Sequence, residues 1–222
     1  MSAPPQARRK VYFVSGLGAD ERAFQFLDLP GVDKIFVKWL PPGPREPLPA
    51  YCQRLLAQID LSQEINLVGM SFGGIVCQEM ARLVPCRKVL LISSVKSPRE
   101  MGWQLRLVAR SRAYRAVPAR LLKWSNLLTA NHYFSVETPA EAALLRQIIE
   151  DTDPEFARWA IAELMAWPAQ APLPGVAHLH GGRDRIFPAA PIRNATIIAD
   201  AGHFMVVNRA AAVSAFIARE LN

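Results

Sequence analysis

A G-x-S-x-G motif centred on Ser71 lies where the pattern of the chain changes from strand to helix. The apolar run at 65–68 predicts a short buried strand, and residues 75–84 predict a helix. At such a junction the motif is typical of a strained turn that exposes the serine hydroxyl. The chain folds back too tightly there for a Cβ at Gly69 or Gly73. We therefore predict that Ser71 is a nucleophile.

A serine hydroxyl needs a base of near-neutral pKa, and that base needs a carboxylate to hold its tautomer. Both residue types follow predicted strands later in the chain. Asp184 comes after the apolar stretch 176–180, and His203 comes after the short stretch 196–199. Open α/β sheets carry their sites just beyond the carboxyl ends of the strands. We therefore predict that Ser71, Asp184 and His203 form one catalytic group.

A glycine-rich turn follows the first predicted strand, and it offers backbone N–H groups to a reacting oxygen. We predict that the N–H groups of Leu17 and Phe72 form an oxyanion hole for a tetrahedral intermediate. The amino terminus of the helix after Ser71 adds a favourable dipole. The alternative is the phosphate loop of a nucleotide-binding fold. That loop needs a full G-x-G-x-x-G, whereas Glu21 stands where the last glycine would be.

The chain order serine, aspartate, histidine and the turns around these residues resemble the α/β-hydrolase fold family over nearly the whole chain. Three short sequence segments are similar to those of a small group of bacterial hydrolases: Gly16–Arg22, Asp151–Pro154 and Gly202–Asn208. The resemblance implies a mostly parallel sheet with helices on both faces and a Ser-His-Asp triad. One departure is Ser15, where many members carry a histidine. The backbone donor should survive that change, but the local packing and the substrate preference need not.

The composition is that of an ordinary globular protein, with 51% hydrophobic and 20% charged residues among 222. This length suits one domain with a sizeable core, so we expect a single α/β-hydrolase domain over 1–222. No apolar run approaches the roughly 20 residues of a membrane span, and residues 1–10 lack the apolar part of a secretory signal. Three cysteines without C-x-x-C spacing favour a reducing compartment. We therefore predict a cytoplasmic protein without a transmembrane segment.

Much of the formal net charge of +7 is concentrated between Lys96 and Lys123, where Glu100 is the only acid. Basic residues are interleaved there with apolar ones such as Trp103 and Leu107, which predicts helices with one cationic face. Three interpretations stay open: a solvated surface, attraction of an anionic substrate or membrane surface, and nucleic-acid binding. No recognised nucleic-acid module accompanies the charge, so we expect no nucleic-acid partner. We expect a mild preference for acyl substrates with a negative group, held by an arginine of this basic band.

Strand and helix patterns alternate from residue 10 to about 95, and this alternation predicts a parallel sheet. The proline-rich run at 41–47 is typical of a surface loop. Besides the strand at 65–68, we expect strands near 11–14, 34–39 and 88–92 and a helix near 48–59.

From about 97 to 170 the strand pattern disappears and helical patterns replace it, with helix starts at Thr138 and Asp153. We interpret this interval as a helical cap over Ser71. Aromatic residues of the cap would either line an acyl pocket or pack the cap onto the sheet. These residues are Trp103, Trp124, Tyr133, Phe134, Trp159 and Trp167.

Two histidines, His178 and His180, lie on one face of a predicted strand and resemble a metal-binding pair. No acidic third ligand accompanies them, so a core position or a role behind the catalytic residues fits better. Ser93 and Ser94 also follow a strand, but they lack glycine neighbours. We predict neither a metal site nor an organic cofactor.

These observations together predict a serine hydrolase that acts on a small carboxylic ester, thioester or related acyl compound. Two other functions are compatible with the same fold. One is a lyase that uses the three residues as a general base, and the other is a ligand-binding protein built on a disabled hydrolase. The complete set of serine, aspartate and histidine argues against a disabled enzyme. Fold alone does not decide among them.

Overall fold

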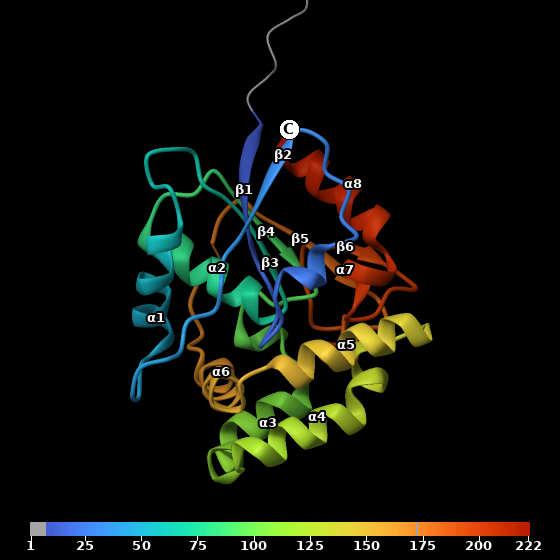
Figure 1. The fold of residues 1–222 in the computed structure, drawn as a ribbon. Helices are drawn as coiled ribbons and strands as arrows, with labels where there is room; N and C mark the ends of the chain where they lie inside the picture. The colour runs from blue at the N-terminus through green and yellow to red at the C-terminus, as the bar shows by residue number, and fades with distance from the viewer. Residues whose placement is uncertain (1–7, 172) are drawn as a thin grey trace, which may run out of the picture.

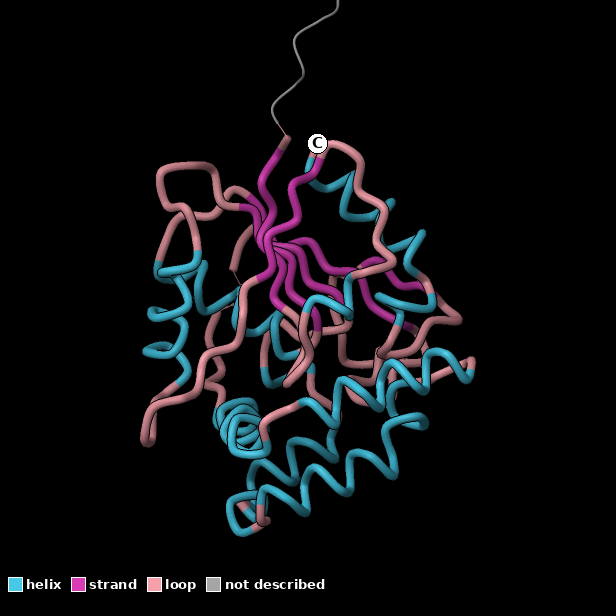
Figure 2. Tube along the Cα trace, in the orientation of Figure 1, coloured by secondary structure: helices cyan, strands magenta, loops and turns pink. Residues whose placement is uncertain are grey.

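A computed structural model describes residues 8–171 and 173–222, without the side chains of seven residues between 113 and 126. Its centre is a parallel sheet with the spatial order β2-β1-β3-β4-β5-β6 (Figures 1 and 2). The mostly parallel sheet predicted from the alternating patterns is therefore confirmed. The strands are β1 (Arg9–Val14), β2 (Val32–Phe36), β3 (Asn66–Met70), β4 (Lys88–Ile92), β5 (Val176–Gly181) and β6 (Thr196–Ile198).

Both faces of the sheet are buried, and the alternation of side chains along β1 shows how. Val11 and Phe13 belong to one hydrophobic core, whereas Tyr12 and Val14 belong to the other. Successive side chains of a strand point to opposite faces, so a central strand that is apolar at every position must be covered twice. The cores on the two faces require helices on both sides of the sheet.

The helices that cover the sheet come from the first half and from the end of the chain. Helices α1 and α2 contribute Leu55 and Ile75 to one core, and α8 contributes Phe216 to the other. Figure 1 shows α1 and α2 on one side of the strands and α8 on the opposite side. The bounds are η1 (Glu21–Phe24), α1 (Leu48–Leu55), η2 (Leu56–Gln58), α2 (Phe72–Leu83), α7 (Met205–Asn208) and α8 (Ala210–Leu221).

Between β4 and β5 the described residues form helices and no strand, and we call this part the helical insertion. It lies at one end of the sheet (Figure 1). The helix starts predicted at Thr138 and Asp153 are confirmed, because their side chains accept hydrogen bonds from the backbone N–H groups of Glu141 and Phe156. The insertion consists of η3 (Pro98–Glu100), α3 (Trp103–Ser111), η4 (Ala113–Ala116), α4 (Ala119–Phe134), α5 (Pro139–Asp151) and α6 (Pro154–Ala166).

The strand expected near 34–39 is shifted toward the amino terminus, since β2 ends at Phe36. The Val37 N–H still donates to the Phe13 carbonyl over 2.9 Å. The backbone of Lys38 then pairs with a side chain: its N–H donates to Oε1 of Gln58 and its carbonyl accepts from Nε2 of Gln58, each over 2.9 Å. Hydrogen bonds to a remote residue therefore replace the sheet ladder where the apolar pattern continues.

None of the helices in the described part of the chain has both the length and the apolar character that crossing a membrane requires. Residues 1–7, on which much of the secretory-signal prediction depends, lie outside the described residues. The side chains of Trp124, Arg115 and Lys123, which the cap and basic-band predictions include, lie outside them as well.

Candidate active site

Ser71 lies in the turn between β3 and α2, with φ 54° and ψ −122°. This positive φ is strained for a residue with a Cβ. A Cβ added at Gly73 would lie 2.2 Å from the Ser15 carbonyl oxygen, and one at Gly69 would lie 2.5 Å from the Gly73 oxygen. The turn is anchored to the sheet, because the Ser71 N–H donates to the Ile92 carbonyl over 2.9 Å. The predicted need for glycine on both sides of Ser71 is thus confirmed.

Asp184 follows β5, and its carboxylate is buried in a loop that satisfies it with hydrogen bonds. One carboxylate oxygen accepts from the backbone N–H groups of Ile186 and Phe187, each over 2.8 Å. The other oxygen accepts from Nδ1 of His203 over 2.7 Å. Backbone donors of this kind fix the position of a carboxylate and compensate for its burial.

His203 follows β6 and is fully buried. Its ring lies edge-on to Phe134 and Phe187, with ring centroids 5.3 and 5.7 Å away. With Nδ1–H donating to Asp184, Nε2 is left to accept, and the Ser71 hydroxyl donates to it over 2.9 Å. The structure therefore brings the three predicted side chains into one hydrogen-bonded chain.

The predicted oxyanion residues Leu17 and Phe72 both line the cavity beside Ser71. Phe72 is the first residue of α2, so its N–H belongs to the turn that lacks acceptors within the helix. The loop after β1 lies against the serine, since a Cβ added at Gly16 would be 3.5 Å from the Ser71 Cβ. Both residues thus lie beside the serine, whereas the role of their N–H groups stays a prediction.

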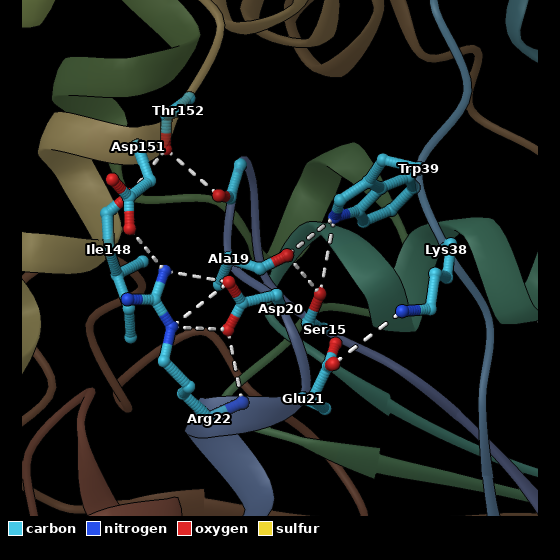
Figure 3. Close-up of polar contacts among 11 residues, drawn as sticks. Ser15, Ala19, Asp20, Glu21, Arg22, Lys38, Trp39, Ile148, Asp151 and Thr152 are labelled. Atoms are coloured by element: carbon cyan, nitrogen blue, oxygen red, sulfur yellow. Dashed lines mark hydrogen bonds and ion pairs between the residues drawn. The ribbon is translucent and has the colours of Figure 1, made fainter.

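Figure 3 shows how the loop after β1 is held. On one side, the Ser15 hydroxyl donates to the Ala19 carbonyl and accepts from the Trp39 indole N–H over 3.1 Å. On the other side, the Thr152 hydroxyl donates to the Gly18 carbonyl over 2.8 Å. Ser15, the residue that departs from the family pattern, therefore secures the turn through its hydroxyl.

Arg22 connects the same loop to the end of α5 (Figure 3). Its Nη2 lies 2.7 Å from the carboxylate of Asp20 and 2.8 Å from that of Asp151. These groups are partly exposed, so the pairs contribute little to stability. Their effect is to position the loop, because two carboxylates from separate segments bind one rigid guanidinium.

A cavity of about 480 Å³ opens beside Ser71, between the sheet and the helical insertion. Its wall is mostly apolar and includes Leu145 and Ile148 of α5 and Ile161 of α6. A few polar side chains join them, among them Gln104 of α3. A largely apolar pocket with a few polar groups is typical of small-molecule sites.

The aromatic residues of the insertion divide between the two roles considered from the sequence. Tyr133 and Phe134 line the cavity, whereas Trp159 and Trp167 pack against the hydrophobic core. Trp103 is 65% exposed and does neither. An apolar pattern alone does not reveal which side of a helix faces a cavity.

His178 and His180 lie buried on β5, behind Asp184, with ring centroids 5.2 Å apart. His180 Nε2 is 2.8 Å from the Phe187 carbonyl and 3.7 Å from the Asp184 carboxylate. Burial lowers the pKa of His178 to about 3 and also lowers the pKa of His180, so both rings are neutral near pH 7. Within the described residues, no three His, Cys, Asp or Glu side chains are grouped to hold a metal ion.

Two residues of the site were not predicted as functional. Arg185 lines the cavity, and Thr152 holds the loop after β1. A signal for Arg185 was available, since it directly follows Asp184 in the same loop. Thr152 belongs to one of the segments that resemble the family, but its role could not be predicted. Its hydrogen-bond partner, Gly18, is remote in the sequence.

The fold and this arrangement agree with the family comparison. The model of the alpha/beta hydrolase family matches residues 9–216, so the chain belongs to that family. Membership in this family supports a hydrolase. No protein among the curated sequences matches the chain.

Several solved structures share the fold. An esterase from Thermogutta terrifontis is 20% identical, with a TM-score of 0.64, over 96% of this chain and 89% of its own. A 2-hydroxy-6-oxo-6-phenylhexa-2,4-dienoate hydrolase from Rhodococcus sp. strain RHA1 is 20% identical, with a TM-score of 0.66, over 99% and 92%. An enol-lactonase from Burkholderia xenovorans LB400 is 17% identical, with a TM-score of 0.66, over 96% and 91%. At such low identity these likenesses show a shared fold and nothing finer.

Proposed function

We propose that the protein is a serine hydrolase that cleaves a carboxylic ester, a thioester or a related acyl bond. The observation that carries this proposal is the hydrogen-bonded chain from the Ser71 hydroxyl through His203 to Asp184, with distances of 2.9 and 2.7 Å. A strained turn exposes the hydroxyl and a buried carboxylate orients the imidazole, which is the arrangement that acyl transfer needs. The esterase and the enol-lactonase that share the fold show that this architecture is compatible with the same reaction class.

The proposed reaction has two halves. His203 Nε2 takes the proton of Ser71 as its oxygen attacks the substrate carbonyl, and the N–H groups of Leu17 and Phe72 stabilise the oxyanion. His203 then gives this proton to the leaving group, and the acyl group remains on Ser71. A water molecule, deprotonated by His203, then attacks the acyl carbonyl. The bond from the acyl carbon to the Ser71 oxygen breaks, His203 returns the proton to that oxygen, and the carboxylic acid product leaves. Asp184 keeps the imidazole in the required tautomer and stabilises its protonated form.

We also propose that residues 97–170 act as a cap on this site. The cavity beside Ser71 is walled by α3, α4, α5 and α6 as well as by the loops of the sheet. The insertion therefore limits which acyl groups reach the serine.

The proposal is tested by replacing Ser71 with alanine and by an exposed control, Ser62→Ala. We expect Ser71→Ala to abolish labelling by a fluorophosphonate and to lower kcat/KM for short esters by about 10⁴-fold or more. Ser62→Ala should leave both unchanged, and thermal unfolding should show that both variants fold. Full activity of Ser71→Ala would overturn the proposal.

Mass spectrometry separates hydrolysis from the lyase alternative. A substrate turned over by hydrolysis should leave an acyl group on the peptide that contains Ser71. Turnover that never produces this adduct would favour a lyase in which His203 acts as a general base. A protein that binds esters without any turnover would instead be a ligand-binding protein on the same fold.

A further inference from the structure

The cavity beside Ser71 is lined mostly by apolar side chains and by one charged side chain. Leu145 and Ile148 of α5 and Met165 of α6 contribute hydrocarbon surface to the wall. Among the cavity-lining residues that the structure describes, Arg185 is the only one with a charged side chain. A site of this composition suits a molecule with an apolar part and one anionic group.

Arg185 is held at the edge of the cavity by the helical insertion. Its Nη1 donates to the carbonyl of His132, near the end of α4, over 2.9 Å. The neighbouring residue Tyr133 also lines the cavity, so this hydrogen bond fixes the guanidinium beside the cavity wall. The side chain follows Asp184 directly, and the Asp184 loop is itself fixed by two backbone hydrogen bonds.

The charge of Arg185 has no acidic partner within ion-pair distance in the described part of the chain. Two other arginines differ clearly. Arg22 lies 2.7 and 2.8 Å from two carboxylates, and Arg209 lies 2.8 Å from each of two. A guanidinium has five N–H donors in a planar fork that fits a carboxylate. Arg185 uses one such donor on a neutral carbonyl and retains its charge for a ligand.

The basic band of the insertion does not supply this charge. None of its arginines with described side chains lines the cavity, Arg106 and Arg110 of α3 included. A preference for anionic substrates would therefore need a different carrier, and the loop after β5 offers Arg185. Arg185 is itself exposed, so what sets it apart from the band is its place on the cavity wall, and added salt should weaken its attraction for an anion.

We propose that Arg185 determines substrate specificity by binding an anionic group, so that the preferred substrate is an acyl ester or thioester with a carboxylate beyond an apolar segment. This inference rests on the proposed hydrolase function. The apolar segment occupies the cavity, and the carboxylate pairs with the guanidinium. Arg185 takes no proton and makes no covalent bond, so it affects substrate choice rather than the chemical steps.

The test compares matched anionic and neutral esters. The anionic set is the mono-para-nitrophenyl esters of succinic, adipic and suberic acids, and the neutral set is the para-nitrophenyl esters of butanoic, hexanoic and octanoic acids. For Arg185→Gln we expect kcat/KM of the best anionic ester to fall about 3- to 10-fold, because the charged hydrogen bond is made by an exposed side chain. The neutral ester of equal length should change by less than about twofold. Arg185→Lys should retain part of the preference, because it keeps the charge without the fork.

Arg183→Gln is the matched control, since Arg183 is an exposed arginine of the same loop and does not line the cavity. It should leave both sets of esters unchanged. Equal losses for anionic and neutral esters in Arg185→Gln, or no loss for either, would overturn the proposed anion site while leaving the hydrolase function in place.

Binding separates this inference from hydrolysis itself. In a Ser71→Ala background, calorimetry with octanoate and with octan-1-ol compares a charged and a neutral ligand of equal length. We expect octanoate to bind more tightly, and we expect Arg185→Gln to remove that difference. If octanoate binding depends on Arg185 but the wild-type protein hydrolyses no ester, the hydrolase function is overturned and the anion site is kept. Equal binding of octanoate before and after Arg185→Gln would overturn the anion site.

Discussion

The loops at the carboxyl edge of the sheet and the helical insertion face the same cavity, but they are stabilised differently. Around Ser71 the backbone is packed so closely that Gly73 has no room for a Cβ. His203 is fully buried and hydrogen-bonded on both sides. In contrast, α3 buries none of its residues, and its Leu107 is 60% exposed. The reacting groups are thus set by close packing, whereas part of the cavity wall tolerates change.

The two regions meet at the ends of the inserted helices. At the end of α5, the Thr152 hydroxyl donates to the Gly18 carbonyl. At the end of α4, the Phe134 carbonyl accepts from the Phe204 N–H over 3.0 Å, directly after His203. Residues of the insertion therefore contact both the loop of the predicted oxyanion hole and the loop of His203. A change in the insertion reaches the reacting groups through these ends.

The largest expected effect is at the glycine beneath the serine. Gly73→Ala should lower the free energy of unfolding by at least about 3 kcal/mol, because its Cβ would meet the Val14 and Ser15 carbonyls at 2.2 Å. Gly43→Ala is the control, since its Cβ would have no neighbour closer than 3.5 Å. Urea unfolding measures both. Equal stability of the two variants would contradict the close packing of the serine turn.

A smaller effect is expected from pH, and it arises in the body of the sheet. The pKa of His178 is about 3 in the folded protein, because the ring is buried, and about 6.5 in the unfolded chain. Between these values the unfolded chain binds more protons, so stability falls as the pH drops below about 6.5. From pH 7 to pH 5 this histidine should cost about 2 kcal/mol.

The measurement is urea unfolding of the wild type and of His178→Leu at both pH values. Other groups also titrate in this window, so the difference between the two proteins isolates His178. The variant should lose about 2 kcal/mol less than the wild type between pH 7 and pH 5. An identical loss in both would mean that the buried ring is not kept neutral by the fold.

The smallest effect is expected on the exposed face of α3. Leu107→Ala should change the free energy of unfolding by less than about 0.5 kcal/mol, because the side chain is 60% exposed. Leu55→Ala in α1 is the same substitution at a fully buried site, and it should cost about 2–5 kcal/mol. Thermal and urea unfolding compare the two. Similar losses for both would show that α3 is packed as closely as the helices on the sheet.

The expected parallel sheet and the helical interval were readable from the chain, because periodicity and helix caps are local signals. The helices on both faces of the sheet were expected only from the family resemblance. The same local signals misplaced one strand. Val37 and Trp39 continue an apolar pattern, yet the strand ends at Phe36. The backbone N–H and carbonyl of Lys38 pair with the Gln58 side chain, a partner that is remote in the sequence. The sequence also did not predict which aromatic residues of the insertion line the cavity, since the same ring fills a core or lines a cavity according to its neighbours.

By itself the sequence determined which chemical groups follow the strands: Ser71 in its glycine turn, Asp184 after β5 and His203 after β6. It did so because a parallel sheet brings the carboxyl ends of its strands to one edge. Only the tertiary structure decided that Arg185, and none of the described arginines of the basic band, lines the cavity. Such choices depend on side-chain direction and on contacts between residues far apart in sequence, and no local pattern encodes either.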